Sequence, residues 1–392
     1  MVPGPESPKP GWDTYHTHRP RSLPRIGSVH PGKKGTMRSM GRIAVRVFVI
    51  LGVVASAASC GLVDTLLGTD LAGDGTPTKI TGLQKAGVEY FSTAARDVVA
   101  DGSYAYVATY TYDDVGGVAV VDIANPDAPN QVGQYFPSSS DYRLYAANIV
   151  MAGTNVYIDG GSGGRMFAKV NVSSPSSPSL VYQLSGSEAA YALIAEGTSL
   201  FYIAGGGMYM YDVSDTYAAT YQSNFKPAEG NVFGGCAGDG LIYVRCDGAT
   251  FRVLQPNTAR TGVTELSRIP IDYNGTGNMV RSGDHVYLQL YAENDCSLLV
   301  INVASSSAPF VEGRLAVQRV GRIAVSQDCV FICTAGTIDL IDVGDPAEPA
   351  LLTSFVDASI SSVNGVSAAG DTLVIADGGG GAGKLRCYRM LK

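Results

Sequence analysis

Charged side chains, tryptophan and histidine are all scarce in this 392-residue sequence. Asp, Glu, Lys and Arg make up 16% of the residues, which leaves few of the side chains that exposed helices favour. Trp12 is the one tryptophan, and three of the four histidines lie in the first thirty residues, so a chain without that leader keeps only His285. The body of the chain is therefore without a multi-histidine metal centre and has one candidate imidazole base.

Glycine and tyrosine are abundant instead, with 48 and 22 residues, a composition typical of a β-rich protein with many turns. Nine of the 28 basic residues and two of the 35 acidic residues precede Cys60, so the remainder has 19 basic and 33 acidic residues, a net charge of −14. Because an acidic surface of this kind repels polyphosphate, we expect no nucleic-acid binding.

The beginning of the chain has the features of an export signal. Residues 1–36 are rich in Pro, Arg, Gly and His without hydrophobic periodicity, which indicates a disordered leader or a misassigned start, with Met37 or Met40 as the true one. Residues 37–59 are interpreted as a signal peptide whose apolar core is the twelve-residue stretch 47–58. Since a helix needs roughly 20 apolar residues to cross a bilayer, we expect cleavage rather than a retained anchor.

The cleavage site itself, Ala-Ala-Ser-Cys at 57–60, resembles the lipobox of bacterial lipoproteins. The resemblance implies that Cys60 is lipidated and becomes the new N-terminus, and that Gly61 directs the protein to the outer membrane. The alternative is an ordinary signal peptidase site in which Cys60 has no role. Residues 60–78 follow as a flexible tether. We therefore expect an exported protein, lipid-anchored to the outer membrane or cell surface.

Residues 79–392 contain an internal repeat, which predicts the fold. Seven units of about 45 residues each contain short apolar runs separated by turns. The second runs align on one column of residues, spaced 41 to 51 apart: Tyr106, Tyr157, Tyr202, Tyr243, Tyr287, Phe331 and Val374. The third runs give another column: Asp122, Asn171, Asp212, Leu254, Asn302, Asp342 and Arg389. This pattern predicts an all-β protein, a seven-bladed β-propeller of four-stranded antiparallel blades.

The last unit indicates how the ring closes. It has only three strands, at 363–368, 372–376 and 384–389, and the segment 79–88 stands before the first complete unit with no other role. We predict that this segment pairs as the outer strand of the last blade, which removes an exposed edge.

Four units share a more specific signature at the end of the third strand: VVDIANPDAP (120–129), KVNVSSPSSP (169–178), VINVASSSAP (300–309) and LIDVGDPAEP (340–349). This signature resembles the LVIVD repeat family. The resemblance implies a β-propeller on an exported bacterial protein, generally without an assigned activity. Unit three lacks the prolines, unit four has Leu254 in place of the acid, and unit seven also departs from the pattern.

Several polar motifs have a structural interpretation beside a functional one. The Asp/Asn column is interpreted as Asx-turns rather than a ring of ligand acceptors. The glycine clusters at 159–164, 204–207 and 377–383 are interpreted as hairpins, since none has the sequence of a phosphate or calcium loop. His285 is interpreted as a turn residue, because no nucleophile elbow accompanies it.

Six cysteines follow Cys60. Cys329 and Cys333 lie too far apart on one strand to form a disulfide, and Cys236 and Cys246 look out of register in one hairpin. Bridges between hairpins or blades, or free buried thiols, remain open.

The inner strands hold the candidate binding site. Propellers usually bind ligands where the first strands of all blades converge at the mouth of the channel. Counting five residues back from each turn gives Asp97, Asn148, Asn278 and Arg322, a polar set that either binds a ligand or solvates the rim. A loop with Tyr110, Tyr112, Asp113 and Asp114 offers a second surface for a partner.

We therefore expect a monomeric, non-enzymatic binding or scaffolding module of the cell envelope, without cofactor or metal, whose partner is an envelope protein or a glycan. The alternative is a hydrolase or lyase at the channel mouth that uses carboxylates or a bound Ca²⁺. Convergence of two or three acids at one mouth would favour the enzyme.

Overall fold

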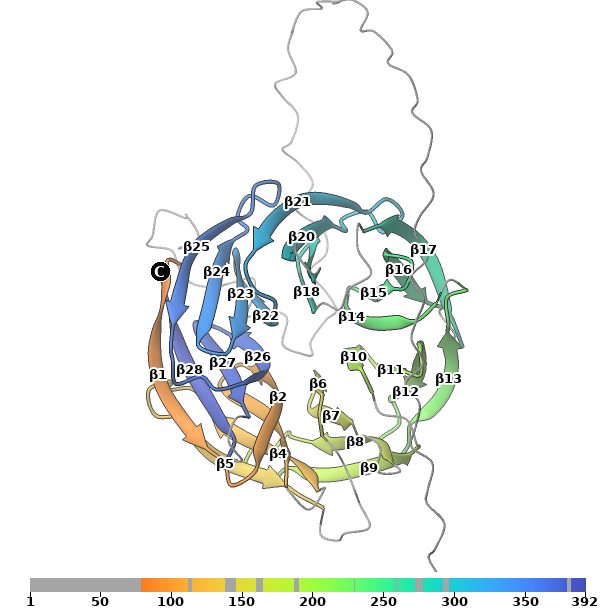
Figure 1. Ribbon diagram of the computed structural model, residues 1–392. Helices are drawn as coiled ribbons and strands as arrows, with labels where there is room; N and C mark the ends of the chain where they lie inside the picture. Colours follow the sequence, from red (N-terminus) through yellow and green to blue (C-terminus); the bar gives the residue numbers. More distant parts are fainter. Residues whose placement is uncertain are drawn as a thin grey trace, which may run out of the picture. The chain divides into compact units, whose positions relative to one another are not determined.

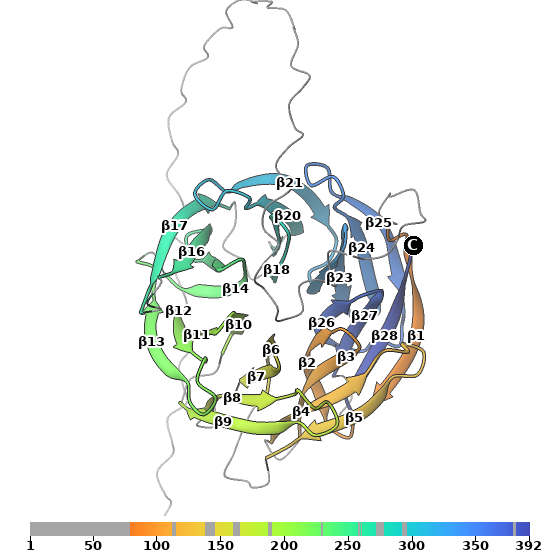
Figure 2. The ribbon, with the colours of Figure 1, turned by 180° about the vertical axis from the view of Figure 1, so that it is seen from behind.

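The described part of the chain forms seven four-stranded antiparallel sheets arranged around a central channel (Figure 1 and Figure 2). The structure, a computed structural model, describes residues 79–111, 115–137, 146–159, 165–186, 190–228, 230–257, 259, 261–271, 278–291, 296–378 and 382–392. The predicted leader, signal peptide and tether with Cys60, and the loop residues 112–114, lie outside them. The predicted all-β, seven-bladed propeller is confirmed.

Each blade is a meander of four strands, numbered here from the channel outward. Blade one has β2 (Ala94–Asp101), β3 (Tyr104–Tyr110), β4 (Gly116–Asp122) and β5 (Asn130–Tyr135); blade two has β6 (Ile149–Ala152), β7 (Asn155–Asp159), β8 (Arg165–Asn171) and β9 (Ser179–Ser185). Blade three has β10 (Ala192–Glu196), β11 (Ser199–Ala204), β12 (Gly207–Asp212) and β13 (Thr220–Phe225); blade four has β14 (Val232–Gly238), β15 (Leu241–Cys246), β16 (Thr250–Pro256) and β17 (Val263–Pro270). Blade five has β18 (Met279–Ser282), β19 (His285–Leu290), β20 (Cys296–Asn302) and β21 (Phe310–Val317); blade six has β22 (Arg322–Ser326), β23 (Cys329–Thr334), β24 (Thr337–Asp342) and β25 (Ala350–Val356). Blade seven has β26 (Val363–Ala369), β27 (Thr372–Asp377), β28 (Lys384–Leu391) and β1 (Gly82–Tyr90).

The two ends of the propeller meet in blade seven. Strand β1 pairs antiparallel with β28 from Gly82 opposite Leu391 to Tyr90 opposite Lys384, with a bulge between Lys85 and Val88. This pairing confirms the predicted ring closure. The polar groups along the outer side of β28 are thereby paired within the molecule.

The core lies between the blades, because each blade packs one face against the next. Tyr106 and Ala108 of blade one, for example, form one buried cluster with Ile149 and Val156 of blade two. Strands in the middle of a blade are covered on both faces, which is why they are continuous apolar runs rather than alternating patterns.

The strand pairing corrects the alignment of two repeats by one residue. Asp212 pairs with Ser199 as Asp122 pairs with Tyr104, so Phe201, not Tyr202, is the blade-three equivalent of Tyr106. In blade four the residue equivalent to Asp122 is Gln255 rather than Leu254, because Leu254 occupies the position of Val121, directly after the bulge. Neighbouring apolar residues of similar size hide such a shift in the sequence.

The acid and amide column forms Asx-turns, as interpreted from the sequence. The side-chain Oδ1 atom of Asp122, Asn171, Asp212, Asn302 and Asp342 accepts in each case the backbone N–H two residues later, over 2.9 to 3.1 Å. These oxygens therefore stabilise the turn between the third and fourth strands, and they face away from the channel mouth.

The proline turn that follows the Asx-turn contacts the outer strand of the preceding blade at a glycine. A Cβ atom on Gly133 of β5 would meet the carbonyl oxygen of Pro175 in blade two at 2.1 Å, and one on Gly313 of β21 would meet that of Pro346 in blade six at the same distance. Gly87 of β1 donates its N–H to the carbonyl of Pro126 in blade one over 2.7 Å. The repeated signature thus holds one blade against the next.

Blade three lacks the prolines, and a lysine of blade two makes the corresponding contact. Lys169 is 5% exposed and donates from Nζ to the carbonyls of Val213 and Asp215, both over 3.1 Å. Its ammonium lies 6.0 Å from the ring centroid of Tyr157 and 5.5 Å from that of Tyr182. The carbonyl groups of the turn and the two rings compensate for the burial of this charge, whose pKa burial lowers.

Replacing the contact glycine should destabilise the propeller. We expect Gly313→Ala to lower the free energy of unfolding by roughly 1–3 kcal/mol, because the new methyl group overlaps a backbone carbonyl that cannot move alone. Urea unfolding followed by circular dichroism measures it. Gly262→Ala is the matched control, since its Cβ would meet only Asn257 Nδ2 at 3.5 Å. Equal midpoints for the two variants would contradict the proposed blade contact.

The six cysteines of the propeller are free thiols, four of them buried. In blade four Cys236 pairs with Tyr243 and Cys246 with Val232, so the two are out of register, as expected. Burial raises the pKa of Cys246 and of Cys387 to about 12, which makes both poor nucleophiles at neutral pH.

Candidate functional site at the channel mouth

The first strands begin, and the hairpins between second and third strands lie, at one end of the channel, which we call the mouth. The four predicted residues occupy equivalent positions there. Asp97 pairs with Ala108 and Arg322 with Cys333, each two residues beyond the column position of its second strand. The backbone carbonyls of Asn148 and Asn278 accept the backbone N–H groups of Asp159 and Gln289, which lie opposite them on the second strands. The corresponding residues of the other three blades are small: Ala192, Gly234 and Gly365.

Asp97 connects three blades. Its Oδ1 accepts the N–H of Val98 over 2.9 Å, and its Oδ2 accepts the N–H of Ile149 in blade two over 3.1 Å. Blade seven comes so close that a Cβ on Gly365 would lie 2.3 Å from Oδ1. Burial, with a smaller contribution from Asp159, raises the pKa of Asp97 to about 6, although Arg322 and the two N–H groups favour the charged form.

The raised pKa of Asp97 predicts a specific pH dependence. Because the pKa in the folded protein, about 6, lies above the usual 3.8, the protonated carboxyl stabilises the fold. That contribution is complete below about pH 4 and is lost as the pH rises through 6. The stability of Asp97→Asn relative to the original protein should therefore increase over this window. Carbon-13 NMR of the carboxyl groups, assigned with the same variant, should give a midpoint near 6; a midpoint near 4 would contradict the assignment.

Asn148 is held by a buried acid that the sequence analysis did not single out. Asp159 is 1% exposed, and it accepts the N–H of Ala147 over 2.5 Å and both the N–H and the Nδ2 of Asn148 over 2.8 Å. Burial raises the pKa of Asp159 in spite of these bonds. The Asn148 amide is therefore a fixed part of the rim, and the oxygens of Asp159 are occupied by backbone and amide donors.

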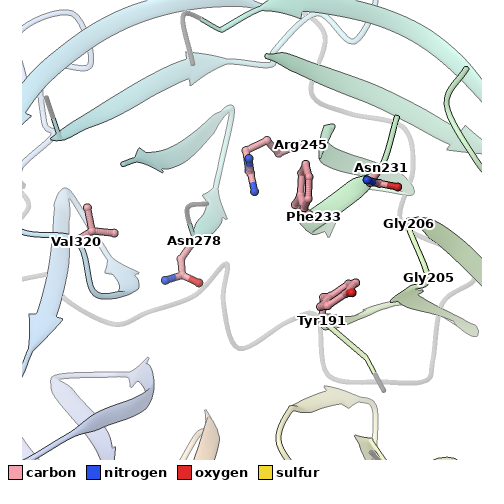
Figure 3. Close-up of a pocket in the computed structure, with 8 residues that line it drawn as sticks. All are labelled: Tyr191, Gly205, Gly206, Asn231, Phe233, Arg245, Asn278 and Val320. Atoms are coloured by element: carbon pink, nitrogen blue, oxygen red, sulfur yellow. The ribbon is translucent and has the colours of Figure 1, made fainter. Parts of the chain in front are cut away.

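Of the four predicted residues, Asn278 lines a cavity. The cavity has a volume of about 640 Å³, and residues of blades three to six line it (Figure 3). Its lining residues are Tyr191, Gly205, Gly206, Asn231, Phe233, Arg245, Asn278 and Val320. The Nδ2 of Asn278 donates to the Gly321 carbonyl over 2.8 Å, which fixes the orientation of the amide. A volume in the range of roughly 300–1,000 Å³ is typical of small-molecule sites.

Arg245 is the one charged residue among the described residues of this lining. It is 2% exposed, and its guanidinium lies 4.8 Å from the ring centroid of Phe233. Phe233 is the extra residue of a bulge in β14, where the pairing with β15 shifts between Val232 and Gly234, and the bulge turns its ring toward the arginine. Burial lowers the pKa of Arg245, but an arginine remains protonated at neutral pH.

A further part of the lining consists of a glycine hairpin and an oriented amide. Gly205 and Gly206 connect β11 and β12 with φ angles of 54° and 80°, so the cluster at 204–207 is a hairpin, as interpreted. A Cβ on Gly206 would meet Asn231 Oδ1 at 2.1 Å. The Oδ2 of Asp247 accepts the N–H of Asn231 over 2.9 Å and its Nδ2 over 3.0 Å.

The sequence did contain a signal for the missed residues. Asp159, Arg245 and Gln289 each stand two residues after the aromatic of the second-strand column, in strands that are otherwise apolar. Gln289 is fully buried, and its Nε2 has no hydrogen-bond partner among the described residues. Polar residues in this position face the next blade near the mouth, and a search of second strands as well as first strands would have found them.

The remaining candidates lie apart from the cavity. His285, at the end of blade five away from the mouth, lies with Nε2 2.9 Å from Glu312 Oε2, which also accepts the Nδ2 of Asn302. The Arg96 guanidinium lies 5.3 Å from the ring centroid of Tyr110. The other three residues of the predicted partner loop lie outside the described residues. Within the described ranges, no three His, Cys, Asp or Glu side chains gather as a metal site would require. Nor does the described chain include a helix long and apolar enough to cross a membrane.

Comparison with known proteins supports the repeat and the fold. A family model described as the LVIVD repeat matches residues 93–136 and 319–357, which are blade one and blade six. The chain therefore carries LVIVD repeats. No curated protein matches the sequence.

Solved structures share the architecture at low sequence identity. The WD40 β-propeller domain of Doa1 is 12% identical with a TM-score of 0.56, covering 80% of this chain and 98% of that one. A chain of the mitotic checkpoint complex is 11% identical with a TM-score of 0.60, covering 81% and 98%. The computationally designed Ika8 protein is 11% identical with a TM-score of 0.52, covering 79% and 100%. At these identities the similarity establishes the propeller fold alone.

Proposed function

We propose that this chain is an exported, lipid-anchored binding module of the bacterial cell envelope, which uses its mouth cavity to hold a ligand. The observation that carries the proposal is the cavity itself. Four blades contribute to one lining that combines aromatic rings, oriented amides and a buried arginine. Such a combination of apolar surface and a few fixed polar groups is what small-molecule sites require (Figure 3).

The sequence supports the location of the module. The apolar stretch 47–58, the cysteine at position 60 and the tether that follows are arranged as in a lipoprotein precursor. The net charge of −14 for the rest of the chain argues for a partner other than nucleic acid. We propose a monomer that binds an envelope protein or a glycan and contacts the membrane through its lipid only.

An enzymatic role, as a hydrolase or lyase, is the second candidate, and Asp97 is the observation in its favour. A carboxyl group with a raised pKa at a channel mouth is a typical general acid. However, both Asp97 oxygens accept backbone N–H groups, and Asp159 is occupied in the same way. Neither carboxylate borders the cavity, so the arrangement favours binding.

Filling the cavity tests the binding function. Val320→Trp places an indole in the cavity, whereas Ala124→Trp places one in a second hollow of about 520 Å³ at the opposite end of the channel. Both are made in a Cys60→Ala background, so that a lipid does not contribute. We expect isolated cell envelopes to retain the background protein and Ala124→Trp equally, and Val320→Trp at least tenfold more weakly. Equal retention of all three would contradict the proposal.

Metabolic labelling tests the anchor. Radioactive palmitate should label the original protein and not Cys60→Ala, because the cysteine thiol is the proposed site of lipidation. Undiminished label in the variant would show that Cys60 is not the anchor.

A further inference from the structure

We infer that the mouth cavity binds a saccharide, with the rings of Tyr191 and Phe233 contacting the apolar face of a sugar and Asn278 accepting a hydrogen bond from one of its hydroxyl groups. The inference rests on the proposed function, since it names the ligand class of that site. It depends on two aromatic rings and one oriented amide of the lining. A sugar ring combines the two matching surfaces, because it has C–H groups on its faces and hydroxyl groups around its edge.

The aromatic rings of the lining come from two neighbouring blades. Tyr191, directly before β10, is 65% exposed, and Phe233 in the bulge of β14 is half-buried. Both rings border the same space (Figure 3). An apolar ligand needs a site that encloses most of its surface. A wall as open to water as Tyr191 suits a ligand that packs one apolar face on the ring and keeps its polar groups hydrated, as a sugar does.

Arg245 contributes to this site by holding Phe233 in position. Arg245 is 2% exposed, and its guanidinium lies 4.8 Å from the centroid of the Phe233 ring. This contact stabilises the ring in the place where the bulge puts it. We therefore assign Arg245 a positioning role and leave the contact with the ligand to Phe233.

The amide of Asn278 supplies an acceptor of fixed orientation. Its Nδ2 donates to the carbonyl of Gly321 over 2.8 Å, so the amide plane is held from one side. The Oδ1 atom is thereby directed toward the space that Tyr191 borders (Figure 3). An amide oxygen accepts from an O–H or N–H group, and a sugar hydroxyl provides such a donor. A ligand without a donor would leave this acceptor unpaired at a cost in affinity.

A peptide fits the cavity less well. An extended peptide needs a row of backbone N–H and C=O partners, as at an open strand edge. The backbone segment of the described lining is the two-residue turn Gly205–Gly206, where the Gly206 carbonyl already accepts the N–H of Val232 over 3.2 Å. A cavity of about 640 Å³ is also of the size that holds a compact ligand. The described walls therefore favour a saccharide over a protein segment.

Enzymatic treatment of the envelope distinguishes a saccharide from a protein partner. Isolated cell envelopes are digested with proteinase K, washed, and incubated with the Cys60→Ala protein. We expect the digested envelopes to retain the protein as untreated ones do. Oligosaccharides released from the digested envelopes by partial acid hydrolysis should compete and lower the retention at least tenfold. Retention that is lost after proteinase K, or that the oligosaccharides leave unchanged, would overturn the inference.

Two tyrosines of blade three show whether the cavity is the site. Tyr191→Ala should lower retention about fivefold, whereas Tyr191→Phe, which keeps the ring, should stay within about twofold of the parent. Because Tyr191 is largely exposed, neither change should disturb the fold. Tyr217→Ala is the matched control, since Tyr217 is 81% exposed in the turn between β12 and β13, away from the mouth. Equal retention of Tyr191→Ala and Tyr217→Ala would contradict the assigned ring contact.

The result for Val320→Trp separates this inference from the proposed function. If proteinase K abolishes retention while Val320→Trp is still poorly retained by untreated envelopes, the partner is a protein, so the saccharide assignment is wrong and the binding function stands. If Val320→Trp is retained as well as the Cys60→Ala protein, both are wrong.

Discussion

Deletion of residues 79–90 is expected to lower the melting temperature of the protein by about 8 °C. Ile80 and Leu83 are buried, and burial of such side chains contributes roughly 1.5–3 kcal/mol each. The deletion also removes the Lys85 ion pair with Asp357 at 3.0 Å and leaves the polar groups of β28 unpaired along an exposed edge. With an unfolding entropy of roughly 2.1 cal/mol/K per residue, residues 79–392 give a shift of roughly 1.5 °C for each kcal/mol, so a loss near 5 kcal/mol lowers the melting temperature by about 8 °C.

Differential scanning calorimetry of matched deletions provides the measurement. Deleting 61–72 removes the same number of residues from the proposed tether and should leave the melting temperature unchanged. A second expected effect of the 79–90 deletion is aggregation on storage, because the free edge of β28 can pair with another copy. Identical melting curves for the two deletions would rule out the closing strand as a source of stability.

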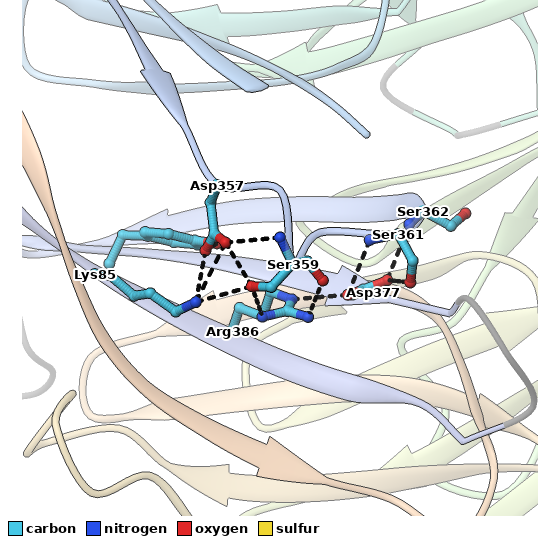
Figure 4. A network of polar contacts seen from close by, with 8 residues as sticks. Lys85, Asp357, Ser359, Ser361, Ser362, Asp377 and Arg386 are labelled. Atoms are coloured by element: carbon cyan, nitrogen blue, oxygen red, sulfur yellow. Dashed lines mark hydrogen bonds and ion pairs between the residues drawn. The ribbon is translucent and has the colours of Figure 1, made fainter. Parts of the chain in front are cut away.

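Arg386→Met is expected to destabilise the protein by roughly 3–5 kcal/mol, since it leaves a buried carboxylate without its cation. Arg386 Nε lies 2.7 Å from Asp377 Oδ2, and the two side chains are 4% and 0% exposed (Figure 4). The guanidinium also donates to the hydroxyl and the carbonyl of Ser359, and Ser361 Oγ donates to Asp377 over 2.8 Å. This network connects β27 and β28 with the loop that enters blade seven.

Arg389→Met is the matched control on the same strand. Arg389 pairs with Asp127, but the two side chains are 38% and 57% exposed, so the loss should be below about 1 kcal/mol. The double variant Asp377→Asn with Arg386→Met should recover part of the stability, because the carboxylate that would otherwise be buried without its cation is then an uncharged amide. Similar losses for the two single arginine variants would contradict the role of the buried pair.

The same pair predicts an acid dependence of opposite sign to that of Asp97. Burial alone would raise the pKa of Asp377, but the hydrogen bonds from Ser361 and Arg386 outweigh it and lower the pKa below the usual 3.8. The stabilisation is therefore complete above about pH 4 and is lost as the pH falls further. The difference in stability between the original protein and Arg386→Met should shrink below pH 4, as urea unfolding at several pH values would measure.

Most of the fold was predictable from the repeat. Tyr106, Tyr157 and Tyr287 recur at the same register because each second strand is buried on both faces and needs a large side chain at the same depth. The Asx-turns were predictable for the same reason, since the turn bond of Asp122 and of each equivalent joins residues two positions apart. Local interactions of this kind repeat wherever the sequence repeats.

The candidate site was predictable only in part. Counting from the turns placed Asp97, Asn148, Asn278 and Arg322 at equivalent positions, but only Asn278 borders the cavity. Arg245 was detectable only as a polar residue in an apolar strand, whereas its contact with Phe233 depends on a bulge that turns the ring toward it. A bulge inserts one residue into a strand without interrupting the apolar pattern, so nothing in the local sequence signals it.

The sequence by itself determined the number of blades, their strand order and the closure of the ring by the segment before blade one, because strand pairing follows from hydrophobic period and turn chemistry along the chain. Only the tertiary structure decided which polar residues converge. Asp97 meets Ile149 and Gly365 from the two neighbouring blades, and Arg245 and Asn278 share a cavity with the Gly205–Gly206 hairpin. Such contacts join residues that are tens to hundreds of positions apart, and they depend on the approach of adjacent blades, which no repeat unit encodes alone.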